Sequence, residues 1–221
     1  IEFTLADASL EFATGTVHLE NGSNLVVNTG NAAITAKGII GTSYENVTLT
    51  TTGTTTVGTG GIGTGTTIED VSLDGTSIVL KGNITTAGTG SDPAGVGDID
   101  FDGAVTIDGA ITITSDVTGT ANDGKIDFAT NTINAEGNDT DSLTLLSGSG
   151  VITVGTIGVT TPLDALSINA SGSAASALTI KQIGTFAGAA GVNGTTTIGN
   201  ASTASVDLSL IHISEPTRPL S

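Results

Sequence analysis

The stretch from Gly97 to Ser115 reads GDIDFDGAVTIDGAITITS and decides the expected fold. Apolar and polar residues alternate in three short segments, Ile99–Phe101, Val105–Ile107 and Ile111–Ile113. A period of two is typical of a β-strand with one buried face. Single Asp-Gly steps separate the segments, and glycine allows the positive φ of a tight corner. Because the segments follow one another so closely, they suit the sides of a solenoid coil better than long hairpin strands.

The same motif returns further along the chain. Gly124-Lys-Ile-Asp-Phe echoes Gly97-Asp-Ile-Asp-Phe, and Gly150-Val-Ile-Thr-Val is a weaker echo. The first interval is about 27 residues and the second is slightly shorter, and both are typical of stacked structural repeats. We therefore expect one coil to contain two or three strands with their loops.

Composition favours a narrow β core. The chain has 221 residues, of which 32 are Gly and 41 are Thr, with five Phe, one Tyr and no Cys, Met or Trp. Small β-branched side chains fill a narrow coil well, but one triplet strand gains only roughly 3–6 kcal/mol from burial before entropy is counted. Coils must therefore stack on one another. The sequence predicts an all-β fold, mainly a parallel β-helix (a β-solenoid) with Gly/Thr-rich loops. The alternative is a set of β-sandwich repeats, which would need longer strands.

Charge excludes some functions. Asp and Glu number 22 against 5 Lys and Arg, for a net charge of −17. Nucleic-acid binding needs clustered Lys and Arg, so we expect no nucleic-acid partner. No run of eighteen apolar residues exists, so we expect no transmembrane helix. Without Cys, neither a disulfide framework nor a thiolate metal site can form.

The chain is expected to have three parts: an irregular Thr/Gly-rich β-repeat region (1–96), a β-helix repeat region (97–207) and a non-native tail (208–221). Within the tail, LSLIHISEPTR from Leu208 to Arg218 resembles the translation of a sequencing-library transposase adapter. We therefore expect a metagenomic fragment that is cut at both ends. Missing capping coils would leave ends that fray or self-associate.

Residues 97–207 resemble the repeat regions of filamentous-haemagglutinin-like adhesins and of related autotransporter or two-partner-secreted proteins of bacteria. The resemblance is carried by Gly97–Thr114, Asp141–Gly155 and Thr161–Ala170. It implies a right-handed parallel β-helix that is exported to the outer cell surface or secreted, with a role in adhesion or biofilm. Its partners would be host or cell-surface glycans or proteins. No catalytic residues come with the resemblance.

A weak surface calcium site is the one cofactor site that we expect. The D-x-D-x-D-G run that begins at Asp98 matches the start of an EF-hand loop, but Gly109 stands where the loop needs its last acid. We therefore reject an EF-hand. Acids on one face repel, however, and calcium with oxygen ligands would relieve this repulsion. The candidate ligands are Asp98, Asp100, Asp102, Asp123, Asp139 and Asp141.

We assign no binding or catalytic role to the threonine-rich segment or to the single His before the tail. We interpret Thr51–Thr67 as a flexible linker or loose coil, in preference to a threonine ladder of the ice-binding kind. His18 is the only His before the tail, so neither a catalytic triad nor a two-His zinc site can be built from it, and we expect exposed filler.

The favoured function is a structural or adhesive repeat segment without catalytic activity. The first alternative is a calcium-stabilised S-layer or extracellular matrix component. The second is a carbohydrate-active β-helix enzyme. Such an enzyme needs convergent carboxylates with basic and aromatic partners, whereas here the lysines are scattered and Tyr44 stands alone.

Overall fold

A computed structural model describes residues 1–66, 68–87, 97–115, 123–137, 140–170, 178–185, 191–199 and 206–208. These residues form strands, bridges and turns, and no helix is found among them. Every strand pairing in this part of the chain is parallel. The chain therefore winds as a parallel β-solenoid, as the sequence predicted, and the alternative of β-sandwich repeats is wrong.

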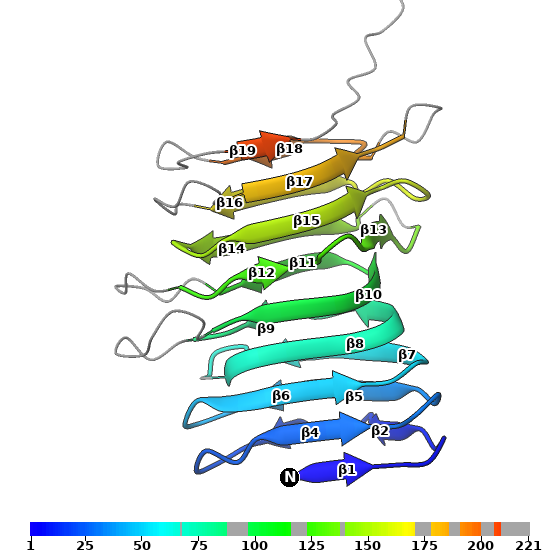
Figure 1. The fold of residues 1–221 in the computed structure, drawn as a ribbon, viewed down its shortest axis with the longest axis vertical. Helices are drawn as coiled ribbons and strands as arrows, with labels where there is room; N and C mark the ends of the chain where they lie inside the picture. The colour runs from blue at the N-terminus through cyan, green and yellow to red at the C-terminus, as the bar shows by residue number, and fades with distance from the viewer. Residues whose placement is uncertain are drawn as a thin grey trace, which may run out of the picture.

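The winding is right-handed. In Figure 1 the chain climbs from the N-terminus at the bottom, and the strands at the front point from left to right. Each turn stacks on the one before it through parallel hydrogen bonds, and neighbouring turns are about 4.8 Å apart. Crossovers between parallel strands favour this hand, because right-twisted strands return to their sheet most easily in this way.

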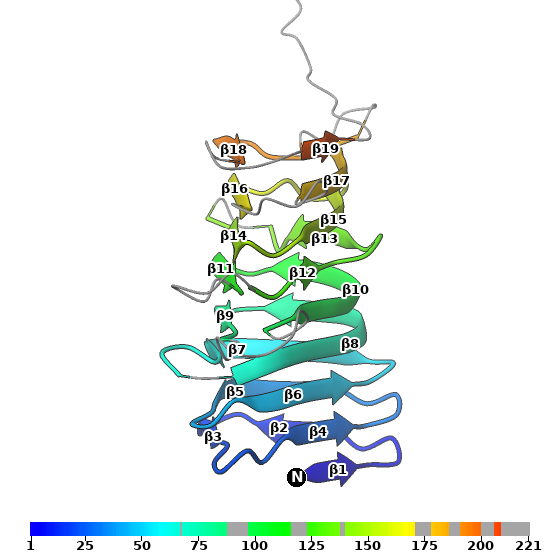
Figure 2. The same ribbon diagram turned by 60° about the vertical axis from the view of Figure 1, so that its left-hand side comes forward.

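Three faces enclose the core, and the pairings define each of them. Several long strands bend at a corner and contribute to two faces, as Figure 2 shows for β8 and β10. Face 1 contains β1 (Glu2–Thr4), β4 (Leu25–Asn28), β6 (Glu45–Thr50), β12 (Ile126–Asp127), β19 (Val206–Leu208) and the first halves of β8 (Ile68–Leu80), β10 (Ile99–Ile107), β15 (Ile152–Ile157) and β17 (Leu178–Ile183).

Faces 2 and 3 complete each turn. Face 2 contains β2 (Leu10–Phe12), β13 (Thr132–Ala135), the first halves of β5 (Ile34–Ile40) and β7 (Thr54–Ile62), and the second halves of β8, β10, β15 and β17. Face 3 contains β3 (Val17–His18), β9 (Ile84–Thr85), β11 (Ala110–Thr114), β14 (Ser142–Gly148), β16 (Ala165–Ala170), β18 (Thr196–Ile198) and the second halves of β5 and β7.

The core consists of stacked aliphatic columns. Along face 1, Ile99 lies between Val71 and Ile126, and Ile152 follows Ile126. All four side chains are at most 1% exposed. One aromatic pair interrupts the aliphatic columns: Phe101 and Phe128 stack in neighbouring turns with ring centroids 4.3 Å apart. Burial grows with each added turn, because a side chain in one turn is covered by its counterparts above and below.

The register confirms the repeat intervals that the sequence predicted. Ile99 pairs with Ile126, and Ile126 pairs with Ile152, so the two steps equal the intervals between the glycine motifs. Elsewhere the step from turn to turn is shorter, as from Leu25 to Val47, or longer, as from Ile111 to Leu143. Loops between the strands absorb part of this variation, and register shifts also occur within pairings such as β5 with β7 and β8 with β10.

The interpretation of Thr51–Thr67 as a linker or loose coil is wrong. Thr54–Ile62 forms β7, which pairs with β5 on one side and with β8 on the other. Thr51 and Thr55 are buried, and their hydroxyls donate to Ala32 O (2.6 Å) and Asp74 O (3.1 Å). Each hydroxyl satisfies a carbonyl inside the coil, which explains how a threonine-rich segment can line a core.

The expected boundary near residue 96 lies within one continuous stack. The strands before it form turns like those after it, and β8 pairs with β10 over eight residue pairs across residues 81–98. Of the expected adapter-derived tail, only Leu208 lies among the described residues, where it ends β19.

Candidate functional site

The corner that leads into face 1 carries a ladder of side-chain oxygens, which we call the Asx ladder: Asn24, Asn46, Asp70 and Asp98. Each oxygen accepts a backbone N–H from the next turn. Asn24 Oδ1 accepts from Asn46 N (2.8 Å), Asn46 Oδ1 from Asp70 N (3.1 Å), Asp70 Oδ1 from Asp98 N (2.9 Å) and Asp98 Oδ1 from Lys125 N (2.9 Å). The carboxylate of Asp98, a candidate calcium ligand, thus already has a structural role.

Burial raises the pKa of Asp98 above its ordinary value. The hydrogen bond from Lys125 N–H and the positive charge of Lys125 lower this pKa. The nearby negative charges of Asp70 and Asp100 raise it further. Sequence reasoning missed the ladder. Its signal was visible, however, as an Asn or Asp directly before Leu25, Val47, Val71 and Ile99, the apolar residues that pair in register from turn to turn along face 1.

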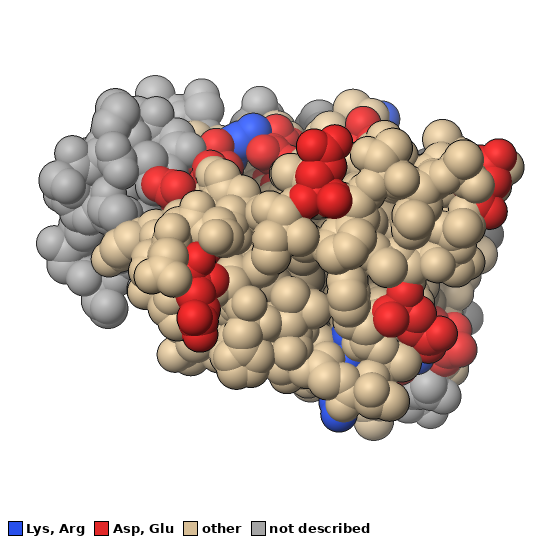
Figure 3. Space-filling model, turned by 90° about the horizontal axis from the view of Figure 1, so that it is seen from below, with Lys and Arg blue, Asp and Glu red and all other residues tan. Residues whose placement is uncertain are grey.

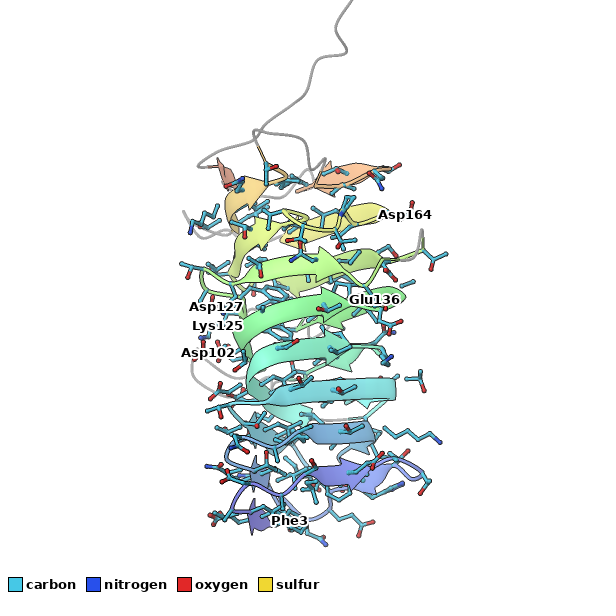
Figure 4. All side chains as sticks on the ribbon, turned by 90° about the vertical axis from the view of Figure 1, so that its right-hand side faces the viewer. Phe3, Asp102, Lys125, Asp127, Glu136 and Asp164 are labelled. Carbon is cyan, nitrogen blue, oxygen red and sulfur yellow. The ribbon has the colours of Figure 1, made fainter. Side chains whose placement is uncertain are left out.

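Lys125 is a cation that lies among the acids of face 1. Its Nζ lies 2.6 Å from Asp100 Oδ1 and 3.8 Å from Asp127 Oδ2. Asp100 and Asp127 are register partners in neighbouring turns, so Lys125 neutralises part of their repulsion. The hydrogen bond to Asp100 raises the pKa of Lys125, and the surrounding carboxylates outweigh the opposite effect of burial. Figure 4 shows Lys125, Asp127 and Asp102 gathered on one edge of the stack.

Asp102 stacks on Asp74 as its register partner in the turn below. Burial raises the pKa of Asp74, and the charge of Asp102 raises it further. Opposed like charges on neighbouring strands destabilise a sheet. Binding of a proton or a cation to these carboxylates of face 1 would therefore reduce the repulsion between them.

Asp102→Asn should raise the thermal melting midpoint at pH 7 by about 1–3 °C, because it removes one charge of this stacked pair. The raised folded-state pKa of Asp74 means that the folded state binds its proton more tightly than the unfolded state does. The free energy of unfolding of the wild-type protein should therefore rise as pH falls through the folded-state pKa of Asp74. The corresponding rise should be smaller in Asp102→Asn. Asp164→Asn, at an exposed position that is not in register with Asp74 or Asp102, is the matched control. An equal shift in the control would contradict the explanation.

Two of the other candidate calcium ligands, Asp123 and Asp141, lie at different corners. Asp123 Oδ2 accepts from Ser149 N (2.6 Å) and Ser149 Oγ (2.9 Å). Asp141 is fully buried, and its carboxylate accepts from Gly109 N (2.7 Å) and Gly137 N (3.1 Å).

Of the predicted calcium set, Asp98, Asp100 and Asp102 share the outward side of β10 and the residue before it, while Asp139 lies outside the described residues. No group of three or more His, Asp or Glu side chains in the described part of the chain is arranged to hold a metal ion. Calcium binding stays a prediction.

A second corner explains why glycine recurs in the repeat. Thr86, Ser115 and Ser147 are buried where face 3 ends. Their hydroxyls donate to the carbonyls of the glycines that begin the next pass along face 1: Gly97, Gly124 and Gly150. These glycines lie one above the other, so closely that a Cβ on Gly124 would meet Gly97 O at 2.1 Å. The predicted glycine motif is thus a site of close backbone approach.

Glu45 is a fully buried carboxylate that sequence reasoning also missed. Its Oε2 accepts from Thr42 N (2.8 Å) and Ser43 N (2.9 Å), and its Oε1 accepts from Gly22 N (3.2 Å) in the turn below. Burial alone would raise the pKa of Glu45, but these backbone N–H groups outweigh it and the pKa lies below its ordinary value. Glu45 therefore fixes the loop that joins face 3 to face 1.

Glu45→Gln should lower the free energy of unfolding at pH 7 by about 1–3 kcal/mol, because the new amide places an NH₂ against backbone donors. A lowered folded-state pKa gives stability that is present above the unfolded pKa and lost as pH falls through the folded pKa. The difference between variant and wild type should therefore shrink in acid. Urea unfolding across pH measures this, with exposed Glu20→Gln as the control. A pH-independent difference would contradict the assigned role.

Face 3 differs from face 1 in charge. Strands β9, β11, β14, β16 and β18 contain no Asp, Glu, Lys or Arg. Their outward positions carry mainly hydroxyls, and one column runs through Thr112, Thr144, Ser167 and Thr197 in successive turns. The chain of net charge −17 thus presents an acidic face and a neutral, hydroxyl-rich face.

The fold defines the class of protein as a right-handed parallel β-solenoid. No family model, no curated protein and no solved structure matches the chain. The described residues include no helix of the length and apolarity that a membrane span requires.

Proposed function

We propose that this chain is a structural and adhesive repeat segment of a large bacterial protein, exposed on the outer cell surface or secreted, and that it acts without catalysis. The observation that carries the proposal is the separation of charge between the faces. Face 3 offers neutral hydroxyls over five successive strands, while the stacked acids lie on face 1. A neutral hydroxyl surface suits contact with a host or cell-surface glycan or protein, because such a contact avoids repulsion between like charges.

A rigid stack is also suited to a scaffold. Its strands are paired on both sides throughout the interior of the solenoid, so the fold can extend by adding turns without exposing new edges. Strong negative charge on the remaining surface keeps such a protein soluble and limits non-specific association.

Binding of the purified chain to immobilised mannan, a neutral polysaccharide, and to bacterial cells tests the proposal. The variant Thr144→Asp with Ser167→Asp places two charges on face 3, and Thr153→Asp with Thr179→Asp places two on face 1 in the same turns. We expect the face 3 variant to bind at least tenfold more weakly and the face 1 variant to bind like wild type. The proposal would be contradicted if the wild-type chain bound mannan and cells no more strongly than it binds immobilised albumin. Equal losses of binding in the face 3 and face 1 variants would also contradict it. So would turnover of acidic polysaccharides, which the alternative of a carbohydrate-active enzyme predicts.

A calcium-stabilised S-layer or matrix component is the second candidate, now without β-sandwich repeats. The stacked pairs Asp74–Asp102 and Asp100–Asp127 favour it, because a divalent cation would relieve their repulsion. It predicts that millimolar calcium raises the melting temperature of the wild-type chain and has less effect on Asp102→Asn. A melting temperature that calcium leaves unchanged, relative to sodium chloride at equal ionic strength, would remove this candidate.

A further inference from the structure

Tyr44 is an exposed aromatic side chain at an interior corner of the stack, in the loop between β5 and β6. Gly22 N, in the turn below, donates to Glu45 Oε1 (3.2 Å), and Gly41 N donates to Thr66 Oγ1 (3.2 Å) in the turn above. The loop is thus covered by a turn on each side. Tyr44 is nevertheless 40% exposed. Its exposure is therefore a property of the corner itself.

The other aromatic rings in the described part of the chain pack inwards. Phe101 and Phe128 belong to the core, and Phe3 and Phe12 are partly buried against it. Tyr44 instead follows the pass of β5 along face 3 and precedes β6 on face 1. Its ring therefore lies at the border of the neutral face.

The backbone of Tyr44 is in the left-handed region, with φ of 59°. Asp7, Asn21 and Ala129 adopt the same region at other corners. Asn and Asp are tolerated there, whereas a bulky side chain is disfavoured. Residues in such conformations persist where their surroundings fix them, and they are frequent at ligand-binding sites. The turn could be made by Asn at lower cost, so the turn alone does not explain the tyrosine.

The buried carboxylate of Glu45 holds this loop in place. Its Oε2 accepts from Thr42 N (2.8 Å) and Ser43 N (2.9 Å), the two residues directly before Tyr44. Together with the bonds to the turns above and below, these contacts fix the backbone on three sides. A ring on a fixed loop can bind a ligand without paying for ordering of the loop.

The side chains around Tyr44 are mostly neutral and polar. The exposed residues of this corner include Thr42 and Ser43 in the same loop, Asn21 in the turn below and Thr64 in the turn above, with Glu20 as an acid. A pyranose ring has C–H groups on its faces and hydroxyls around its edge. It therefore matches an aromatic ring that lies beside hydroxyls and amides.

Charge selects a neutral sugar over an acidic one. Figure 3 looks along the stack from the end that carries β1 and shows acidic side chains in separate groups around the outline, with few basic ones. The net charge of −17 would repel uronic acids and sulfated sugars.

We propose that Tyr44 is a stacking platform for a neutral hexose of the glycan that the chain contacts. This inference rests on the proposed adhesive function and names one point at which the glycan is held. The face 3 hydroxyls would then meet the glycan beside this point.

Tyrosine fluorescence tests the contact directly. The chain has one Tyr and no Trp, so this signal reports on Tyr44 alone when the purification tag contains neither residue. We expect a saturable change in fluorescence on titration with mannotriose, a neutral sugar. Trigalacturonic acid, an acidic sugar of equal length, should bind at least tenfold more weakly. Equal binding of the two sugars would overturn the choice of a neutral ligand.

Variants measured for binding to soluble mannan separate the ring from the fold. Tyr44→Asn keeps a residue that tolerates positive φ, and we expect it to bind at least tenfold more weakly with no fall in melting midpoint. Tyr44→Phe keeps the ring and should bind within about threefold of wild type. Val26→Asn, which replaces a side chain that is 39% exposed on β4, is the matched control and should bind like wild type.

The outcomes distinguish this inference from the proposed function. Mannan binding that Tyr44→Asn leaves intact, or that leaves the fluorescence unchanged, would overturn the stacking role of Tyr44 while adhesion stands. Binding to bacterial cells without binding to mannan would do the same. Binding to neither would overturn both proposals.

Discussion

Gly150→Ala is expected to destabilise the solenoid by about 3 kcal/mol, although it adds one methyl group to a loop. A Cβ at this position would lie 1.9 Å from Gly124 O and 2.7 Å from Gly124 C, and both are backbone atoms that cannot move aside. The carbonyl of Gly150 also accepts from the buried Ser147 hydroxyl (2.8 Å), so a displaced backbone would leave a buried donor without its acceptor. The expected loss of unfolding free energy therefore has two sources, the steric clash of the added Cβ and the loss of the Ser147 hydrogen bond.

Urea unfolding of the variant measures this loss. Gly15→Ala is the matched control, because nothing lies within 4 Å of its added Cβ and its φ is not left-handed. The control should be neutral or slightly stabilising, since alanine restricts the unfolded chain. Comparable losses in both variants would show that the close stacking of Gly124 and Gly150 is not what requires glycine.

Phe128→Ala is expected to cost about 3–5 kcal/mol of unfolding free energy, as removal of a fully buried aromatic side chain usually does. Phe128 is 0% exposed, and its ring lies parallel to that of Phe101 at a centroid distance of 4.3 Å. The other buried residues of the core are aliphatic, so no further aromatic ring is available to fill the cavity. The loss should therefore approach the upper part of the range.

Phe3→Ala provides the comparison, because Phe3 lies in the first turn and is only partly buried. Its loss should be less than half that of Phe128→Ala. A double-mutant cycle with Phe101→Leu and Phe128→Leu then isolates the ring–ring contact, for which about 0.5–1.5 kcal/mol is expected. Equal losses for Phe3→Ala and Phe128→Ala would contradict the view that stacking between turns determines stability.

The local parts of this structure could be predicted from the sequence. Triplets such as Ile99–Phe101 alternate between buried and outward positions, and the intervals between the three glycine motifs are the true register. Both signals can be read directly from the order of residues in the chain. Thr54–Ile62 was misread because its composition is that of a linker, whereas its strand depends on pairing with two distant turns.

The buried polar groups could not be predicted for a related reason. Glu45 and Asp141 resemble surface acids in the sequence, and only the stacked turns bring backbone N–H groups to their carboxylates. Six acids were expected to gather around calcium. Asp98, Asp123 and Asp141 accept backbone N–H groups at separate corners, and their binding of calcium stays a prediction. Because the number of residues per turn varies, a fixed sequence spacing cannot predict which residues of neighbouring turns make such contacts.

The hydrogen bonds between turns run along the long axis of the molecule (Figure 1). A force that pulls the two ends of the solenoid apart therefore acts parallel to these hydrogen bonds. The bonds of the outermost turn would break first, a few at a time, and the turns would unwind one after another. A turn of about 27 residues, as between Ile99 and Ile126, would release roughly 90 Å of extended chain while the stack shortens by about 4.8 Å. Such a molecule would yield in steps under tension and would dissipate mechanical work over a long extension.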